Sequence, residues 1–312
     1  MPASAQDQVR LGYGFGLAFL PVFICEDLKL IDKHAKALHV DVKANYQRFI
    51  GAAAMRDALA ASSIDVAPFG TAPLLVAWEK TKGLPEQIYA VSGLTTMPLT
   101  LLSAQANLQS LKDFRPADSI AVPALTAPQM YLLEMQSEKI LGQYDRLSGQ
   151  VIAQSPSASL AGLMAGNGPA AAFLSAPYTE LALRDGAVHR VLGSADVMGG
   201  KASFLIMGAS LTYIGRHPQI IAAIGQAIEE AARLIRDEPR RAAQIYLTHE
   251  PSRALNGAAI DAVIRDIRDE FGSAVYGVQS FADFMGRHGE LKTPPRSWKE
   301  IVAPALLNSP SS

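Results

Sequence analysis

The residues best placed to do chemistry are hydroxyls, amides and glycines in seven short segments, each directly after a predicted strand. The segments are 14–18, 50–54, 68–72, 92–96, 123–128, 154–159 and 174–178. None of them contains Asp, Glu, Lys, Arg or His. Hydrolysis, redox chemistry and group transfer usually need an acid, a base, a nucleophile pair or a metal at such positions. The sequence therefore predicts a binding site without a catalytic step.

These uncharged segments can still bind an anion, because predicted helices begin in several of them. The first turn of a helix presents unpaired N–H groups and about half a positive charge. Hydroxyl groups can add donors, small residues let a ligand approach the backbone, and an aromatic ring can cover it. The predicted ligand-binding residues are Phe15, Gly16, Leu17, Gly51, Ala52, Gly70, Thr71, Ser92, Thr95, Thr126, Ala127, Gln129, Ser155, Ser175, Tyr178 and Lys201.

Each of these residues also has a structural interpretation. A Ser or Thr before a helix is often only a cap, a glycine can simply relieve a turn, and Lys201 can be an ordinary surface lysine. An uncharged rim equally suits a neutral heterocycle held by stacking. Both interpretations stay open at the level of sequence.

Two stretches of the chain, residues 47–73 and 152–178, share one pattern. Each has a strand end, a loop of small residues, a short helix, an apolar strand and an uncharged loop that opens another helix. They lie too far apart for a solenoid repeat, whose period is about 20–50 residues. We therefore expect two similar α/β lobes, although any two strand–helix–strand units look alike at this level.

Strands and helices alternate in the predicted elements, which favours mostly parallel sheets. The first lobe is predicted at 9–97 plus 207–312, and the second at 98–206. Expected strands are 9–13, 39–46, 64–67, 88–92, 98–102, 119–122, 151–153, 170–173 and 188–192, and a segment at 202–207 crosses back. Expected helices include 18–36, 51–61 and 129–141, and the chain is expected to be helical from His217 onward, with an apolar stripe from Ile220 to Ile235.

Composition excludes several functions. The chain has 312 residues, of which 49% are hydrophobic and 18% charged, enough for a sizeable core. A net charge of −1 gives no electrostatic footprint for nucleic acid or an anionic membrane. The single cysteine, Cys25, is expected to be a buried apolar residue, and six scattered histidines offer no metal-ligand spacing. No apolar run approaches the ~20 residues of a membrane span, and we expect a monomer without cofactors.

The first residues suggest export. Ala3-Ser4-Ala5 is a triplet of the type that signal peptidase cleaves, although no apolar segment precedes it. We expect a periplasmic protein whose signal peptide was removed before Gln6, with residues 1–8 as the remnant of that region. Because alanine is abundant in this chain, chance is the alternative.

Short motifs along nearly the whole chain resemble one family. They are 9–13, 59–67, Gly70-Thr-Ala-Pro73, Leu111-Lys-Asp-Phe114, 120–122, 163–166, Ser175-Ala-Pro177-Tyr178, 281–285 and Pro295-Arg-Ser-Trp298. In this order they are similar to the periplasmic substrate-binding proteins of ATP-binding-cassette (ABC) importers. Within these, the chain looks like the nitrate, sulfonate and taurine group, which shares its fold with pyrimidine-precursor binders.

The resemblance implies a type II binding-protein fold: two lobes with mixed, mostly parallel sheets, joined by two hinge strands. It also implies closure around a small-molecule ligand near 92–96 and 204–207, and delivery to a membrane permease. Two departures concern the ligand. Sulfonate binders often carry Trp-Asp before the Pro-Tyr pair, where this chain has Leu174-Ser175-Ala176, and residues 166–171 replace an acidic pattern with Gly-Asn-Gly-Pro-Ala-Ala.

The expected function is capture of a small anionic organic solute, similar to a sulfonate, nitrate or carboxylate. One alternative is a neutral or aromatic heterocycle such as a pyrimidine precursor. A second is an enzyme of the same fold, such as the dehydratases of menaquinone synthesis or the pyrimidine synthase of thiamine synthesis. The pyrimidine synthase has a site rich in His and Cys, and no part of this sequence matches such a site. A third is a sensor that partners a receptor rather than a permease.

Overall fold

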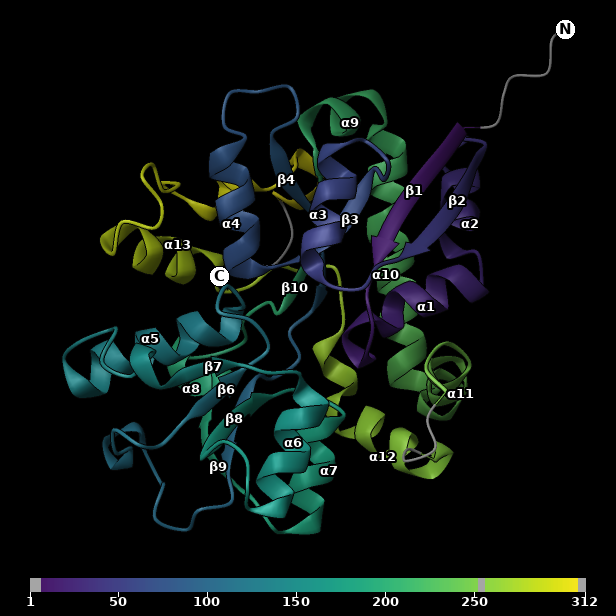
Figure 1. Ribbon diagram of the computed structural model, residues 1–312. Coiled ribbons are helices and arrows are strands. Elements are labelled where there is room, and N and C mark those ends of the chain that lie inside the picture. The colour runs from purple at the N-terminus through teal and green to yellow at the C-terminus, as the bar shows by residue number, and fades with distance from the viewer. Residues whose placement is uncertain (1–6, 252–255, 308–312) are drawn as a thin grey trace, which may run out of the picture. The chain divides into compact units, whose positions relative to one another are not determined.

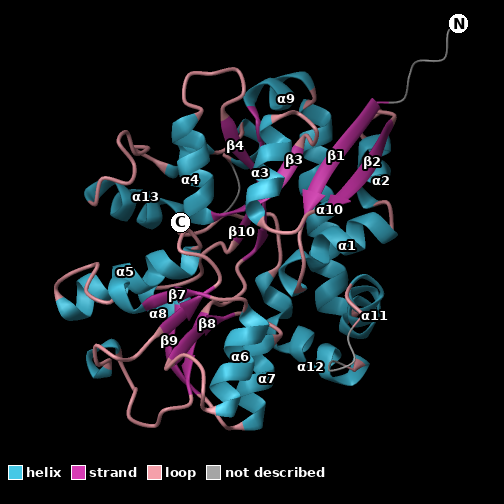
Figure 2. Ribbon diagram, viewed as in Figure 1, coloured by secondary structure: helices cyan, strands magenta, loops and turns pink. Residues whose placement is uncertain are grey.

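The computed structural model describes residues 7–251 and 256–307 (Figure 1). The chain divides into two compact units. Unit 1 contains the residues before Met97 and after Phe204, and unit 2 is Met97–Phe204. Each unit is built around one five-stranded sheet with helices packed on it, as Figure 2 shows by colour.

The sheet of unit 1 has the strand order β2-β1-β3-β10-β4. Its strands are β1 (Asp7–Tyr13), β2 (Val42–Arg48), β3 (Val66–Gly70), β4 (Ile88–Thr95) and β10 (Leu205–Ser210). β1 is parallel to β2 and β3, whereas β10 is antiparallel to both of its neighbours. Four strands therefore end at the same edge of the sheet, and only β10 begins there.

Helices on both sides of this sheet come from distant parts of the chain. α3 (Ala52–Ala60) and α4 (Thr71–Lys80) follow β2 and β3, and α4 packs on β3, β4 and β10. α1 (Leu20–Asp27) and α2 (Leu30–Ala37) follow a short 3-10 turn, Leu17–Phe19. Both pack on α10 (Pro218–Asp237), whose predicted apolar stripe is buried, as expected. The remaining helices are α9 (Leu211–Arg216), α11 (Pro239–His249), α12 (Gly257–Ile267) and α13 (Val278–Arg287).

The sheet of unit 2 repeats this topology, with the order β7-β6-β8-β5-β9. Its strands are β5 (Thr100–Ser103), β6 (Ile120–Val122), β7 (Val151–Ala153), β8 (Ala171–Leu174) and β9 (His189–Gly193). β6 is parallel to β7 and β8, and β5 is antiparallel to β8 and β9. The fourth position of each sheet is thus held by an antiparallel strand, β10 in unit 1 and β5 in unit 2.

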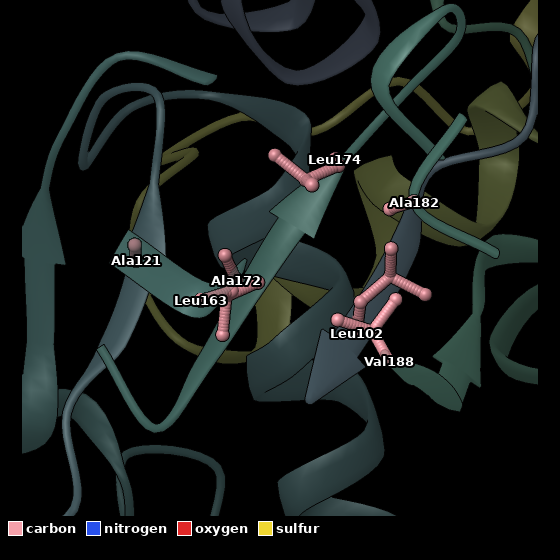
Figure 3. Packing of buried hydrophobic residues seen from close by; sticks show 7 residues of the cluster. All are labelled: Leu102, Ala121, Leu163, Ala172, Leu174, Ala182 and Val188. Atoms are coloured by element: carbon pink, nitrogen blue, oxygen red, sulfur yellow. The ribbon is translucent and has the colours of Figure 1, made fainter. Parts of the chain in front are cut away.

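The helices of unit 2 are α5 (Pro128–Leu141), α6 (Pro156–Ala165), α7 (Tyr178–Asp185) and α8 (Ser194–Met198). Small and branched apolar side chains from the sheet and from α6 and α7 form its core (Figure 3). Leu102 and Ala172 lie on neighbouring strands and are fully buried, and Tyr178 packs against the cluster from the start of α7. This packing fixes the end of β8 and the start of α7 against each other.

The predicted α/β fold with mixed, mostly parallel sheets is confirmed, and so is the repeat. Residues 47–73 contain the end of β2, then α3, β3 and the start of α4; residues 152–178 contain β7, α6, β8 and the start of α7. The single helix expected at 18–36 is wrong. Lys29, with φ of 50°, interrupts it between α1 and α2.

Several strand boundaries also differ from expectation. β2 is shifted towards its carboxyl end and includes Gln47 and Arg48, while His39, with φ of 60°, lies outside it. β3 includes Pro68, Phe69 and Gly70, which were expected in a loop. The first shift matters for function, because it makes Arg48 the last residue of a strand at the carboxyl edge.

Candidate functional site

The carboxyl edge of the unit 1 sheet gathers the starts of three helical segments. Tyr13, Arg48 and Gly70 end the parallel strands β1, β2 and β3. Gly16, Gly51 and Gly70 then stand at the N-cap positions of the 3-10 turn, α3 and α4. Gly16 and Gly51 have φ of 96° and 88°, which favour glycine over residues with a Cβ. Parallel α/β sheets commonly bind ligands at this edge.

The start of α3 is the most open of the three. Gly51, Ala52, Ala53 and Ala54 are exposed, Ile50 is 88% exposed, and no side chain caps the helix. The first N–H groups of a nine-residue helix are therefore available to a ligand or to water. Thr71, at the start of α4, is buried instead.

The loop after β1 is already engaged by a carboxylate. The Gly16 N–H donates to Oε1 of Glu250 at 3.2 Å. The same oxygen accepts from Nη2 of Arg48 at 3.2 Å, and Nη1 of Arg48 donates to the carbonyl of His249 at 3.1 Å. The loop residues themselves are uncharged, but charged side chains from other segments reach this loop. The charges come from the last residue of β2 and from the end of α11.

Aromatic rings surround the Arg48 guanidinium. Its central carbon lies 4.6 Å from the ring centre of Phe15, 5.3 Å from that of Tyr13 and 5.5 Å from that of Phe23. Tyr13 and Phe23 are buried, whereas Phe15 is 51% exposed. Burial raises the pKa of the Tyr13 phenol, and the nearby Glu26 carboxylate raises it further. Leu17, another predicted ligand residue, is buried beneath this loop.

Ser92 and Thr95, near the end of β4, are buried and their hydroxyl protons are already donated. Ser92 Oγ donates to the carbonyl of Gly93 at 2.7 Å, and Thr95 Oγ1 donates to the carbonyl of Glu270 at 2.8 Å. The N–H of Gly93 also donates to the Ser273 carbonyl at 2.6 Å. The end of β4 is therefore held by the segment 270–274.

The carboxyl edge of the unit 2 sheet brings together the second group of predicted residues. Val122, Ala153 and Leu174 end the parallel strands β6, β7 and β8, and α5, α6 and α7 begin beyond them. Thr126 is exposed and Ala127 half-buried at the start of α5. Gln129, in the first turn, is 3% exposed, and its Oε1 has no partner among the residues that the structure describes.

The remaining predicted residues have mixed roles. Ser155 is exposed and accepts from the Ala158 N–H at 3.4 Å, so it does act as the cap of α6. Ser175 follows β8 and Tyr178 is the first residue of α7, and both are half-buried. Lys201 is exposed and lies between α8 and β10. The structure therefore gathers the predicted set into two edges, one in each unit, with Lys201 outside the strand-to-helix loops.

A groove of about 490 Å³ lies elsewhere on unit 1, along α10. His34, Gln226, Glu229 and Arg233 line it, but none of the predicted ligand residues does. Oε1 of Glu229 already accepts from the N–H and hydroxyl of Ser273 at 2.6 and 2.7 Å. We therefore place the candidate site at the strand edges, where parallel sheets present helix N-termini.

Two kinds of feature are absent from the residues that the structure describes. Among them, no group of three or more His, Cys, Asp or Glu side chains is arranged to hold a metal ion. Within the same residues, no helix combines the length and apolar character needed to cross a membrane.

Comparison by sequence gives no match, either to a protein-family model or to a curated protein. Solved structures do share the fold. The periplasmic aliphatic sulphonate binding protein SsuA from Escherichia coli is 17% identical with a TM-score of 0.75, over 97% of this chain and 99% of that one. The alkanesulfonate-binding protein SsuA from Xanthomonas axonopodis pv. citri, bound to MOPS, is 17% identical with a TM-score of 0.72 and the same coverage.

The periplasmic nitrate-binding protein NrtA from Synechocystis PCC 6803 is 15% identical with a TM-score of 0.61, over 96% of this chain and 86% of that one. At these identities the likeness establishes the fold. These similar structures are periplasmic binding proteins, which is the family that the sequence motifs resemble.

Proposed function

We propose that this protein is the solute-binding component of an ABC import system and captures a small organic solute with an anionic group. The observation that carries the proposal is the open start of α3 at the carboxyl edge of the unit 1 sheet. Uncapped N–H groups there, next to exposed Gly51 and Ala52, suit an anion at a helix N-terminus. The shared fold with sulfonate- and nitrate-binding proteins supports the same class of ligand.

Exposed apolar side chains favour a ligand with an apolar body over a compact ion such as nitrate. Phe15 and Ile50, after the first two parallel strands of unit 1, are 51% and 88% exposed. In unit 2, Leu125 follows β6 and is 57% exposed, and Ile152 lies within β7 and is 41% exposed. Each CH₂ group buried against such residues contributes about 0.8 kcal/mol, or about fourfold in affinity. An organic sulfonate or carboxylate can gain this energy, and nitrate cannot.

The proposal includes capture between the two units by hinge closure and no catalytic step. The chain passes between units at Thr96–Met97 and at Phe204–Leu205, which matches the two crossings that hinge closure needs. Export to the periplasm and delivery to a membrane permease belong to the same proposal and rest on the resemblance to binding proteins.

A neutral or aromatic heterocycle is the second candidate. It is favoured by one observation, the half-exposed Phe15 ring at the β1 loop, on which a flat ligand can stack. Binding of a pyrimidine in preference to every anion would replace the leading proposal and keep the fold.

A thermal-shift screen against sulfonates, carboxylates, nitrate, aromatic acids and pyrimidines tests the ligand class. A ligand at about 100 times its dissociation constant adds roughly 2.7 kcal/mol of stability, which raises the melting temperature by several degrees. We expect organic anions to give this shift and nitrate to give less.

Two substitutions in one helix then test the anion contact. Ala53→Glu adds a negative charge at the open start of α3, and Ala60→Glu adds the same charge at its exposed end. We expect Ala53→Glu to weaken anion binding at least tenfold and Ala60→Glu to leave it nearly unchanged. Equal effects of the two substitutions would remove the α3 start from the site.

A further inference from the structure

The contact between Gly16 and Glu250 changes the chemistry of the β1 loop. Gly16 was predicted as a ligand-binding residue, yet its N–H donates to Oε1 of Glu250 at 3.2 Å. Arg48 donates to the same oxygen at 3.2 Å and to the His249 carbonyl at 3.1 Å. The Gly16 N–H and both terminal nitrogens of Arg48 are thus used by the chain itself.

The surrounding charges are predominantly negative among the residues that the structure describes. His249 joins α11 to two acids of α1: its Nε2 lies 2.8 Å from Oδ1 of Asp27, and its Nδ1 lies 4.0 Å from Oε2 of Glu26. Glu250 therefore pairs with Arg48, while Glu26 and Asp27 face the His249 ring. In these described contacts three carboxylates meet Arg48 and His249, so acidic groups outnumber basic ones, which disfavours a ligand anion and favours a cation.

Glu250 keeps an acceptor for a ligand. Both hydrogen bonds go to Oε1, and within the described part of the chain Oε2 has no partner. The side chain is 20% exposed. Phe15 directly precedes Gly16, and its ring centre lies 4.6 Å from the guanidinium carbon of Arg48, so both partners of the Glu250 carboxylate adjoin Phe15. Phe15 is 51% exposed. A carboxylate oxygen beside an aromatic ring is a suitable partner for an ammonium or N–H group.

We propose that Glu250 is a specificity-determining residue that makes the β1 loop select a hydrogen-bond donor or cationic group of the ligand. The inference rests on the proposed function. In this arrangement the anionic group of the ligand binds at another helix start, such as that of α3. An amino or heterocyclic N–H group of the same ligand donates to Glu250. The preferred ligand is then an organic anion with a donor at its other end.

Two probes of equal size test this assignment by calorimetry. 3-Aminopropane-1-sulfonate and butane-1-sulfonate have the same number of non-hydrogen atoms and differ only in a terminal ammonium or methyl group. We expect the unmodified protein to bind the amino probe about tenfold tighter, as an added hydrogen bond to a charged group allows. Equal affinities, or tighter binding of butane-1-sulfonate, would overturn the inference without any variant.

Glu250→Gln then assigns the preference to this residue. Glutamine can still accept from Gly16 and Arg48 through its oxygen, but it presents an NH₂ donor in place of Oε2. We expect the ratio of the two affinities to fall to about one or to invert. A ratio that stays at its original value shows that another residue selects the donor and overturns the role of Glu250.

The matched control is Glu238→Gln. Glu238 precedes the first residue of α11 and Glu250 follows its last, so the same helix separates them by about 18 Å. Glu238 is exposed and pairs only with Arg241 among its described partners. Its substitution should leave the ratio unchanged. If neither probe binds to the unmodified protein, the proposed function itself fails and this inference falls with it.

Discussion

Asp65 binds Arg10 through both backbone and side chain. Its Oδ2 accepts from the Arg10 N–H at 2.8 Å and from Nε at 3.0 Å, and Oδ1 accepts from Nη2 at 2.6 Å. In return the Asp65 N–H donates to the Arg10 carbonyl at 2.8 Å. The pair joins β1 to the start of β3, next to the partners Leu11 and Val66. It therefore helps to fix the register of two strands whose ends form the candidate site.

Asp65→Ala should destabilise unit 1 by about 1–3 kcal/mol, because it leaves donors of Arg10 without their partner. Hydrogen bonding to Asp65 raises the pKa of Arg10, and an arginine without such a partner is still protonated near neutral pH, so the variant keeps an unpaired charge. Urea unfolding measures the effect. The exposed pair of Glu238 and Arg241 is the control, and Glu238→Ala should cost less than about 0.5 kcal/mol. Equal costs would show that the Asp65 contacts contribute no more than a surface pair.

Gly93→Ala should be strongly destabilising, because a Cβ at this position would overlap the carbonyl oxygen of Ala274 and lie 2.8 Å from its carbonyl carbon. Backbone atoms cannot move aside as a flexible side chain can. We expect a loss of several kcal/mol, or no folded protein, measured by thermal unfolding.

Gly225→Ala is the matched control for that substitution. Gly225 lies inside α10, and nothing lies within 4 Å of the position its Cβ would take. Alanine in a helix interior is about 1 kcal/mol more favourable than glycine, so this variant should gain stability. We therefore expect Gly93→Ala to lower the stability of the protein and Gly225→Ala to raise it. A similar loss of stability in both variants would contradict the close packing of β4 against the segment 270–274.

Glu230 should make stability depend on acid pH. Lys33 Nζ donates to its carboxylate at 2.6 Å, and His34 Nε2 lies 2.7 Å away; these contacts lower its pKa despite its partial burial. Because the pKa of Glu230 is lower in the folded than in the unfolded protein, its carboxylate stabilises the fold at pH values above the unfolded pKa of about 4.3. This contribution is lost as the pH falls through the folded-state pKa. Glu230→Gln should cost about 1 kcal/mol or less at pH 7, since Lys33 is 60% exposed.

The measurement for Glu230 is the difference in unfolding free energy between the two proteins as pH falls from 7 to about 3. We expect this difference to shrink below about pH 4.3. A constant difference across that range would mean that the ion pair with Lys33 is not the cause.

Cys25 should be unreactive in the folded protein. It is buried in α1, and burial raises the pKa of its thiol, so very little thiolate forms near neutral pH. Because it is the only cysteine, a thiol reagent reports on one site. Modification should be slow in buffer and rapid in urea, and rapid modification of the native protein would place Cys25 in a segment that opens locally.

Much of the fold was predictable because hydrophobic periodicity and loop composition are local signals. The alternation of strands and helices, the buried stripe of α10 and the repeat of 47–73 in 152–178 all follow from neighbouring residues. The break at Lys29 was missed, because no glycine or proline marks a residue that adopts positive φ between two apolar leucines.

The charged part of the candidate site was not predictable in the same way. Arg48 and Glu250 lie 202 positions apart, and neither belongs to a strand-to-helix loop. Two weak signals could have drawn attention to them. Arg48 directly precedes the loop at 50–54, and Glu250 follows a helix end and precedes Pro251. Arg48 and Glu250 meet beside Gly16 only in the folded chain.

The position of β10 has a consequence for biosynthesis. Among the described strands, β10 alone joins β4 to the unit 1 sheet, and β10 is translated after every strand of unit 2. A ribosome-bound chain that has released residues up to Met198 already holds all the strands and helices of unit 2, yet its unit 1 has an unpaired β4. We therefore expect the inserted unit to fold first and the unit that surrounds it to close later, when β10 emerges between β3 and β4.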